Sequence, residues 1–138
     1  MIWQKPDTRR FALAKGLSLF EAYSLGTDKA LEVIEWLTRY PEIKTGAFYT
    51  LSLENAQRSK AELSVLMKIF EKELERVKTN SLFEEKGIKL KFVGKKEIFS
   101  RQVQSKMLEA EKITSENDKK TVYLALGYNG QEEIVEAV

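Results

Sequence analysis

The 138-residue sequence contains no cysteine and no histidine. The absence of cysteine excludes disulfides, thiolate nucleophiles and cysteine-bound zinc. The absence of histidine excludes imidazole general bases, histidine-based catalytic triads and most transition-metal sites. Any chemistry must therefore use carboxylates, hydroxyls, amides and guanidinium groups, for which Mg²⁺ is the natural metal.

Long apolar runs and breaks in composition are missing as well. No stretch reaches transmembrane length, and the N-terminus lacks a basic-then-apolar leader pattern. Pro6 and Pro41 are the two prolines, and no linker or repeat divides the chain. The 23 basic and 21 acidic residues leave a net charge of +2, which is too small to imply a polyanionic partner. We therefore expect a single cytoplasmic domain over residues 1–138.

Apolar patterning predicts four strands. Residues 43–51 (IKTGAFYTL) and 121–128 (TVYLALGY) are nearly continuous apolar runs, typical of strands covered on both faces. Residues 88–93 (IKLKFV) alternate apolar residues with lysine, and residues 1–5 are a short, weaker candidate.

Helical periodicity covers residues 27–39, 60–79, 97–115 and 131–138. The stripe in residues 97–115 consists of Val103, Met107, Ala110 and Ile113. Ser59 and Glu62 have the spacing of a capping box, which predicts a helix start at residue 60. The alternation of strands and helices predicts an α/β fold in which a central parallel sheet of about four strands is flanked by helices, on both faces.

Function in such sheets gathers in loops at the carboxyl ends of the strands, and the first of these is residues 5–10. It places Asp7 beside Arg9 and Arg10 at a predicted helix start. Asp7 is either a plain N-cap, or it holds Mg²⁺ while the two guanidinium groups bind a diphosphate. Both interpretations stay open on this evidence.

The second polar loop, residues 52–59, follows the most apolar strand. It is either a turn in which Ser59 caps the next helix, or a binding loop. In the second interpretation Ser52 and Asn55 orient a substrate and Arg58 binds phosphate.

These loops resemble motifs of the cis-prenyltransferases, the undecaprenyl or polyprenyl diphosphate synthase family. Residues 52–58 (SLENAQR) resemble the Ser-x-Glu-Asn-Trp-x-Arg signature, and residues 6–12 (PDTRRFA) resemble Asp-Gly-Asn-x-Arg-aromatic-Ala. Residues 22–26 (AYSLG) lie where the family has Gly-His-x-x-Gly, and residues 125–135 (ALGYNGQEEIV) resemble Asn-Tyr-Gly-Gly-Arg-x-Glu-Ile-Val.

The resemblance implies a dimeric enzyme that adds isopentenyl diphosphate to an allylic diphosphate with cis geometry, using Mg²⁺. The apolar faces of residues 30–37 and 63–77 would wall a tunnel for the growing chain. The implied site consists of Asp7, Ser52 and Asn55 as catalytic residues, with Asp7 also as the metal ligand, and Arg9, Arg10, Tyr23, Glu54 and Arg58 as substrate-binding residues.

Several positions depart from the family pattern. One residue is missing around Asp7, and without that gap Pro6 falls on the metal-carboxylate position. Tyr23 replaces a histidine, Ala56 a tryptophan and Gln131 an arginine. The family's Arg-Thr-Gly-Gly-Glu segment, which binds isopentenyl diphosphate, is not found in residues 1–138, so the fold is expected to be a truncated version of the family's.

Three hypotheses follow. The chain is an enzyme that needs a complementing chain, a non-catalytic subunit that binds prenyl diphosphates or a partner, or an unrelated phosphate or nucleic-acid module. The third rests on the lysine cluster Lys86, Lys89, Lys91, Lys95 and Lys96, which is more typical of a solvated strand edge. We therefore expect no nucleic-acid partner, but a homo- or hetero-oligomer that is cytoplasmic, with peripheral membrane contact as an open alternative.

Overall fold

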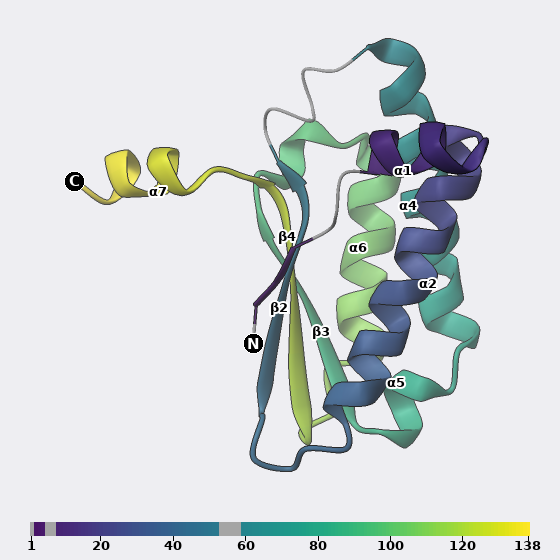
Figure 1. The fold of residues 1–138 in the computed structure, drawn as a ribbon. Helices are drawn as coiled ribbons and strands as arrows, with labels where there is room; N and C mark the ends of the chain where they lie inside the picture. The colour runs from purple at the N-terminus through teal and green to yellow at the C-terminus, as the bar shows by residue number, and fades with distance from the viewer. Residues whose placement is uncertain (1, 5–7, 53–58) are drawn as a thin grey trace.

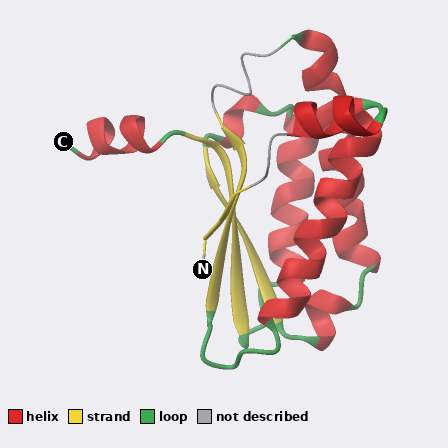
Figure 2. Cartoon of the chain, viewed as in Figure 1, coloured by secondary structure: helices red, strands yellow, loops and turns green. Residues whose placement is uncertain are grey.

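The computed structural model describes residues 2–4, 8–52 and 59–138. Its four strands form one parallel sheet in the order β1-β2-β4-β3, and the elements are shown in Figures 1 and 2. This confirms the predicted α/β class and the parallel sheet of four strands flanked by helices. The elements are β1 Ile2–Gln4, α1 Thr8–Lys15, α2 Leu19–Leu37, β2 Thr45–Ser52, α4 Lys60–Thr79, α5 Leu82–Glu85, β3 Ile88–Gly94, the 3-10 helix η1 Lys96–Ile98, α6 Arg101–Ile113, β4 Lys120–Tyr128 and α7 Gly130–Ala137.

The helices other than α7 gather on one face of the sheet (Figure 1). The expectation of helices on both faces was wrong for the residues that the structure describes. Along β2 and β4, alternate residues such as Tyr49 and Tyr123 are only half-buried, whereas Phe48 and Val122 are fully buried. Alanine, threonine and tyrosine on the second face made the two sequences look continuously apolar, although a half-exposed face accepts these residues.

One hydrophobic core lies between the sheet and the helices. Its central row crosses the sheet through Phe48, Leu124 and Phe92, which are register partners on β2, β4 and β3. None of the helices in the described part of the chain is both long and apolar enough to cross a membrane.

Helix α2 begins at Leu19, well before the predicted start at residue 27. Ser18 and Glu21 form a capping box there: the Ser18 side chain accepts from the backbone of Glu21 at 3.1 Å, and the Glu21 carboxylate accepts from the backbone of Ser18 at 2.9 Å. This box satisfies backbone donors that a helix start otherwise leaves unpaired. The helix also continues through Gly26, which does not interrupt it.

Helix α4 spans residues 60–79 as predicted, and Ser59 caps it by accepting from the backbone of Glu62 at 3.3 Å. In α6 the predicted stripe is buried at Val103, Met107 and Ala110, but Ile113 is 50% exposed.

Candidate functional site

An apolar cavity of about 150 Å³ lies between α2, α4 and the sheet. Its walls include the helix faces that the sequence predicts to line a tunnel. The opposite wall comes from the strands, with Phe83 of α5 and Phe99 just after η1. The apolar lining residues are Ala30, Leu31, Ile34, Leu51, Leu66, Met67, Ile69, Phe70, Leu74, Val77, Phe83, Leu90, Phe92, Phe99, Leu124 and Leu126.

The carboxyl end of β2 contributes two consecutive residues, Thr50 and Leu51, to this lining. Neighbouring residues of a regular strand point to opposite faces, but the pairing of β2 with β4 shifts register between Tyr49 and Leu51. The Thr50 hydroxyl donates to the carbonyl of Ala125 at 2.9 Å at this irregularity. Such irregularities change the direction in which side chains point, and they are common near binding sites. The cavity therefore reaches the residues that immediately precede the polar segment beginning at Ser52.

A buried hydrogen bond joins the first parts of α2 and α4 at the same end of the molecule. The Tyr23 hydroxyl donates to the carboxylate of Glu62 at 3.0 Å, and the two residues are 4% and 8% exposed. The Ser59–Glu62 spacing predicts only a capping role for Glu62, because it contains no sign of a partner on another helix.

The predicted arginines Arg9 and Arg10 lie in the first turn of α1 and are exposed. Figure 1 shows α1 at the same end of the molecule as the start of α4, on the helix side of the sheet and level with the carboxyl ends of the strands. This places both guanidinium groups near a helix N-terminus, which favours anions.

The remaining predicted site residues stay predictions. Asp7, Glu54, Asn55 and Arg58 lie outside the described residues, and only the backbone of Ser52 is described. Within the described ranges no group of three or more acidic side chains could hold a metal ion. The predicted Mg²⁺ site at Asp7 stays a prediction.

The lysine cluster lies along β3, which is one of the two edge strands of the sheet, and in the residues just before and after it. Lys95 pairs with Glu132 of α7, and Lys96 lies 3.7 Å from a carboxylate oxygen of Glu111. The hydrogen bond that Lys95 donates to the Glu132 carboxylate raises the pKa of Lys95 above its ordinary value. Carboxylates thus neutralise part of this cluster, as on an ordinary solvated edge.

The apolar cavity and the polar loops at its end suit one class of ligand. A parallel α/β sheet carries an apolar cavity that begins where its strands run into polar loops. Such a cavity suits a molecule with an apolar tail and an anionic head, because the tail is removed from water while the head meets cationic side chains and helix N-termini.

Comparison with known proteins agrees with this class. The family model described as "Putative undecaprenyl diphosphate synthase" matches residues 7–138, and the chain belongs to this family of prenyltransferases. A tritrans,polycis-undecaprenyl-diphosphate synthase (geranylgeranyl-diphosphate specific) of Pyrobaculum aerophilum is 34% identical over 134 residues, 96% of this chain and 56% of the relative. An isoprenyl transferase of Thermus thermophilus is 36% identical over 94% of this chain and 49% of the relative.

The fold agrees as well. The crystal structure of lavandulyl diphosphate synthase from Lavandula x intermedia, in complex with dimethylallyl diphosphate, superposes with a TM-score of 0.90 at 28% identity. The match covers 99% of this chain and 57% of that one. The chain thus spans about half the length of the relatives that it matches.

Proposed function

We propose that the chain binds an allylic prenyl diphosphate, with the prenyl tail in the apolar cavity and the diphosphate at the polar loops, for condensation with isopentenyl diphosphate in cis geometry. The observation that carries this proposal is the continuity of the cavity with the signature segment. Thr50 and Leu51 line the cavity, and the residues that follow them are Ser52-Leu53-Glu54-Asn55 and Arg58.

The diphosphate would be held by guanidinium groups. Arg10, assisted by Arg9, would approach it from the start of α1, and Arg58 from the loop before α4. Ionisation of the allylic C–O bond leaves negative charge on the departing diphosphate, and positioned cations stabilise that charge. Mg²⁺, when bound by Asp7 and diphosphate oxygens, would supply further charge neutralisation, since Mg²⁺ commonly uses one or two carboxylates together with substrate phosphates.

Ser52 and Asn55 would lie beside the reacting allylic carbon, and Glu54 would help to bind the substrate. A hydroxyl and an amide at this point can orient the isopentenyl unit and help to remove its proton after the new bond forms. The buried Tyr23–Glu62 hydrogen bond supports this region, because it fixes the first part of α2 to the first turn of α4, where the signature segment ends.

Binding and turnover are separate parts of the proposal, because the chain matches only about half of each relative. We propose that binding of the allylic substrate belongs to this chain. Turnover, oligomerisation and the isopentenyl diphosphate site would involve regions equivalent to the remainder of the relatives.

Calorimetric titration with farnesyl diphosphate and Mg²⁺ tests the binding part. We expect saturable binding that Arg58→Ala and Arg10→Ala each weaken at least tenfold, because each substitution removes a charge-assisted contact. Arg39→Ala is the matched control: Arg39 is exposed and follows the far end of α2. Absence of binding, or equal losses in all three variants, would reject the proposal.

Incorporation of labelled isopentenyl diphosphate tests the turnover part. Ser52→Ala should lower incorporation far more than it lowers farnesyl diphosphate binding, because the hydroxyl is assigned to the reacting carbon and not to the diphosphate. If the chain binds farnesyl diphosphate but forms no product, alone or with cell extract, the assignment of catalysis fails while that of binding remains.

A further inference from the structure

Strand β3 forms one edge of the described sheet, with β4 as its neighbour on the inner side. Along a strand, the backbone N–H and C=O groups of successive residues point to alternate sides. The Gly87 carbonyl just before β3 accepts from the backbone of Lys120 in β4 at 3.2 Å. The odd-numbered residues of β3 therefore direct their backbone groups toward β4, whereas Ile88, Leu90 and Phe92 direct theirs away from the sheet.

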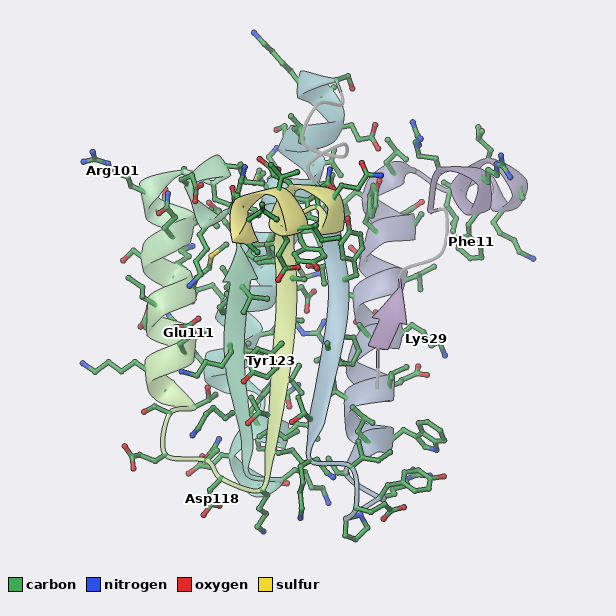
Figure 3. All side chains as sticks on the ribbon, turned by 90° about the vertical axis from the view of Figure 1, so that its left-hand side faces the viewer. Phe11, Lys29, Arg101, Glu111, Asp118 and Tyr123 are labelled. Atoms are coloured by element: carbon green, nitrogen blue, oxygen red, sulfur yellow. The ribbon has the colours of Figure 1, made fainter. Side chains whose placement is uncertain are left out.

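Two of these outward N–H groups donate to side chains at the end of α6. The backbone of Phe92 donates to the Glu111 carboxylate at 2.8 Å, and the backbone of Leu90 donates to the Thr114 hydroxyl at 3.0 Å. Lys96 lies 3.7 Å from the same oxygen of Glu111. Figure 3 shows Glu111 on α6, and the two hydrogen bonds show that this helix lies along the outer edge of β3.

The turn after α6 continues this series of contacts. The Asn117 side-chain amide donates to the carbonyl of Ile88 at 2.8 Å and to the carbonyl of Phe83 in α5 at 3.0 Å. The three side chains are three residues apart in the sequence, and their partners on β3 are two residues apart in the opposite order. Glu111, Thr114 and Asn117 thus occupy the positions at which a further strand would pair with β3. We call these three side chains the edge cover.

The lysines on β3 oppose strand pairing in a second way. Lys89 is half-buried and Lys91 is exposed on the open face of the sheet. Two identical edge strands that are related by a two-fold axis pair antiparallel. Such a pairing would bring the lysines of one copy beside those of the other, and like charges on neighbouring strands are unfavourable.

We propose that the edge cover prevents a second copy of this chain from adding its own β3 strand to the sheet. An uncovered strand edge is a template for pairing with another chain, because its backbone donors and acceptors are unpaired. Here side chains of the same molecule satisfy donors and an acceptor on this edge, and the lysines add charge repulsion. Self-association of the wild type must therefore use another surface.

Amide hydrogen exchange measured by NMR tests the contacts one at a time. In the wild type, the outward amides of Leu90 and Phe92 should exchange within about tenfold of the rate of the Lys91 amide, which faces β4. Glu111→Ala should speed exchange at Phe92 at least tenfold relative to Lys91 and leave Leu90 protected. Thr114→Val should do the reverse, because each substitution removes the acceptor of one amide.

Two further variants serve as controls for this measurement. Glu111→Gln keeps an acceptor oxygen and should retain most of the protection at Phe92. Glu109→Ala removes a carboxylate from the same helix, but Glu109 is 50% exposed and pairs with Lys78 of α4, so exchange on β3 should not change. Equal acceleration at Leu90 and Phe92 in each single variant would indicate general loosening and would overturn the proposal, as would unchanged exchange.

Sedimentation velocity over a concentration series tests the consequence for self-association. Lys89→Thr/Lys91→Thr should sediment like the wild type, because the edge cover is intact. Adding Glu111→Ala should lower the concentration at which larger species form by at least tenfold, with intermolecular β-structure in the infrared spectrum. This variant keeps the buried Thr114, and circular dichroism checks that it is folded. If the folded triple variant associates no more than the wild type, the edge cover does not prevent pairing and the proposal fails.

Discussion

The two faces of the sheet differ in how deeply their side chains are buried, although the same strands form both. On the face toward the helices, Phe48, Leu90 and Val122 are at most 2% exposed. On the other face, seen toward the viewer in Figure 3 with Tyr123 labelled, the side chains are half-buried or exposed. The covered face carries large apolar side chains that pack against the helices and line the cavity, whereas the open face carries tyrosines and lysines.

The open face has its own polar contacts at the carboxyl end. The Tyr49 hydroxyl donates to the backbone carbonyl of Tyr128 at 2.8 Å, and the two rings meet edge to face at 5.8 Å. Helix α7 leaves the sheet on this side (Figure 1) and exposes Ile134 and Val135. In the described residues, the helices therefore cover one face of the sheet and leave the polar and aromatic side chains of the other face partly exposed.

The largest contrast is expected between two neighbouring residues of β2. Phe48→Ala should lower the free energy of unfolding by about 3–5 kcal/mol, because it removes a fully buried ring from a packed core. Tyr49→Ala on the open face should cost about 1–2 kcal/mol, through one hydrogen bond and one ring contact. Urea denaturation measures both, and equal losses would contradict the comparison.

An intermediate effect is expected at Thr114, which is 1% exposed beneath β3. Its hydroxyl accepts from the backbone of Leu90 at 3.0 Å and donates to the carbonyl of Ala110 at 3.0 Å. Thr114→Val should cost about 1–3 kcal/mol, because the buried N–H of Leu90 loses its acceptor. Ser115→Ala removes an exposed hydroxyl from the next residue and should change the free energy of unfolding by less than about 0.5 kcal/mol. Thermal unfolding of both variants measures the difference.

A small effect is expected on the open face of β3. Lys91→Thr replaces an exposed side chain between the buried Leu90 and Phe92, and threonine suits strands. The free energy of unfolding should change by no more than about 0.5 kcal/mol. A loss of several kcal/mol in chemical denaturation would show that something covers this face in solution.

The smallest effect is expected in the pKa of Tyr128. The hydrogen bond to the Glu133 carboxylate is the main cause that raises the pKa of Tyr128 above its ordinary value of 10.0, because it favours the protonated phenol. Glu133→Gln should bring this pKa down, as followed by the ring carbon resonance of Tyr128 in NMR, and it should lower stability at neutral pH only slightly, because the contact is exposed to solvent. Since the folded-state pKa is raised, any stabilisation is complete below pH 10 and is lost as the pH rises through the raised value. A pKa that does not fall in the variant would remove Glu133 as the cause.

Much of the fold could be predicted from local pattern. The strands β2, β3 and β4 and helix α4 follow from apolar runs and from the cap at Ser59, because these signals lie within a few residues of each other. The start of α2 was missed although Ser18 and Glu21 have the same capping spacing as Ser59 and Glu62. Ile113 was misassigned to the core because α6 ends there and Thr114 turns inward in its place.

The candidate site was predictable only in part. The helix faces that line the cavity could be read from periodicity, but the buried partner of Tyr23 could not, because Glu62 lies 39 residues away. The same holds for the ion pairs of Arg76. The spacing of Glu73 and Arg76 predicts their pairing on one helix turn, whereas Asp28 is 48 residues from Arg76 and meets it only when α2 packs on α4.

The sequence by itself determined the strands and most of the helices, because periodicity and capping act over a single turn or strand. It also determined the family motifs, because these are short runs of particular residues. Tertiary structure alone decided which sheet face is covered, where the cavity ends and which charges meet there. Those features depend on how separate helices dock against one sheet, and docking is a sum over contacts that no local segment contains.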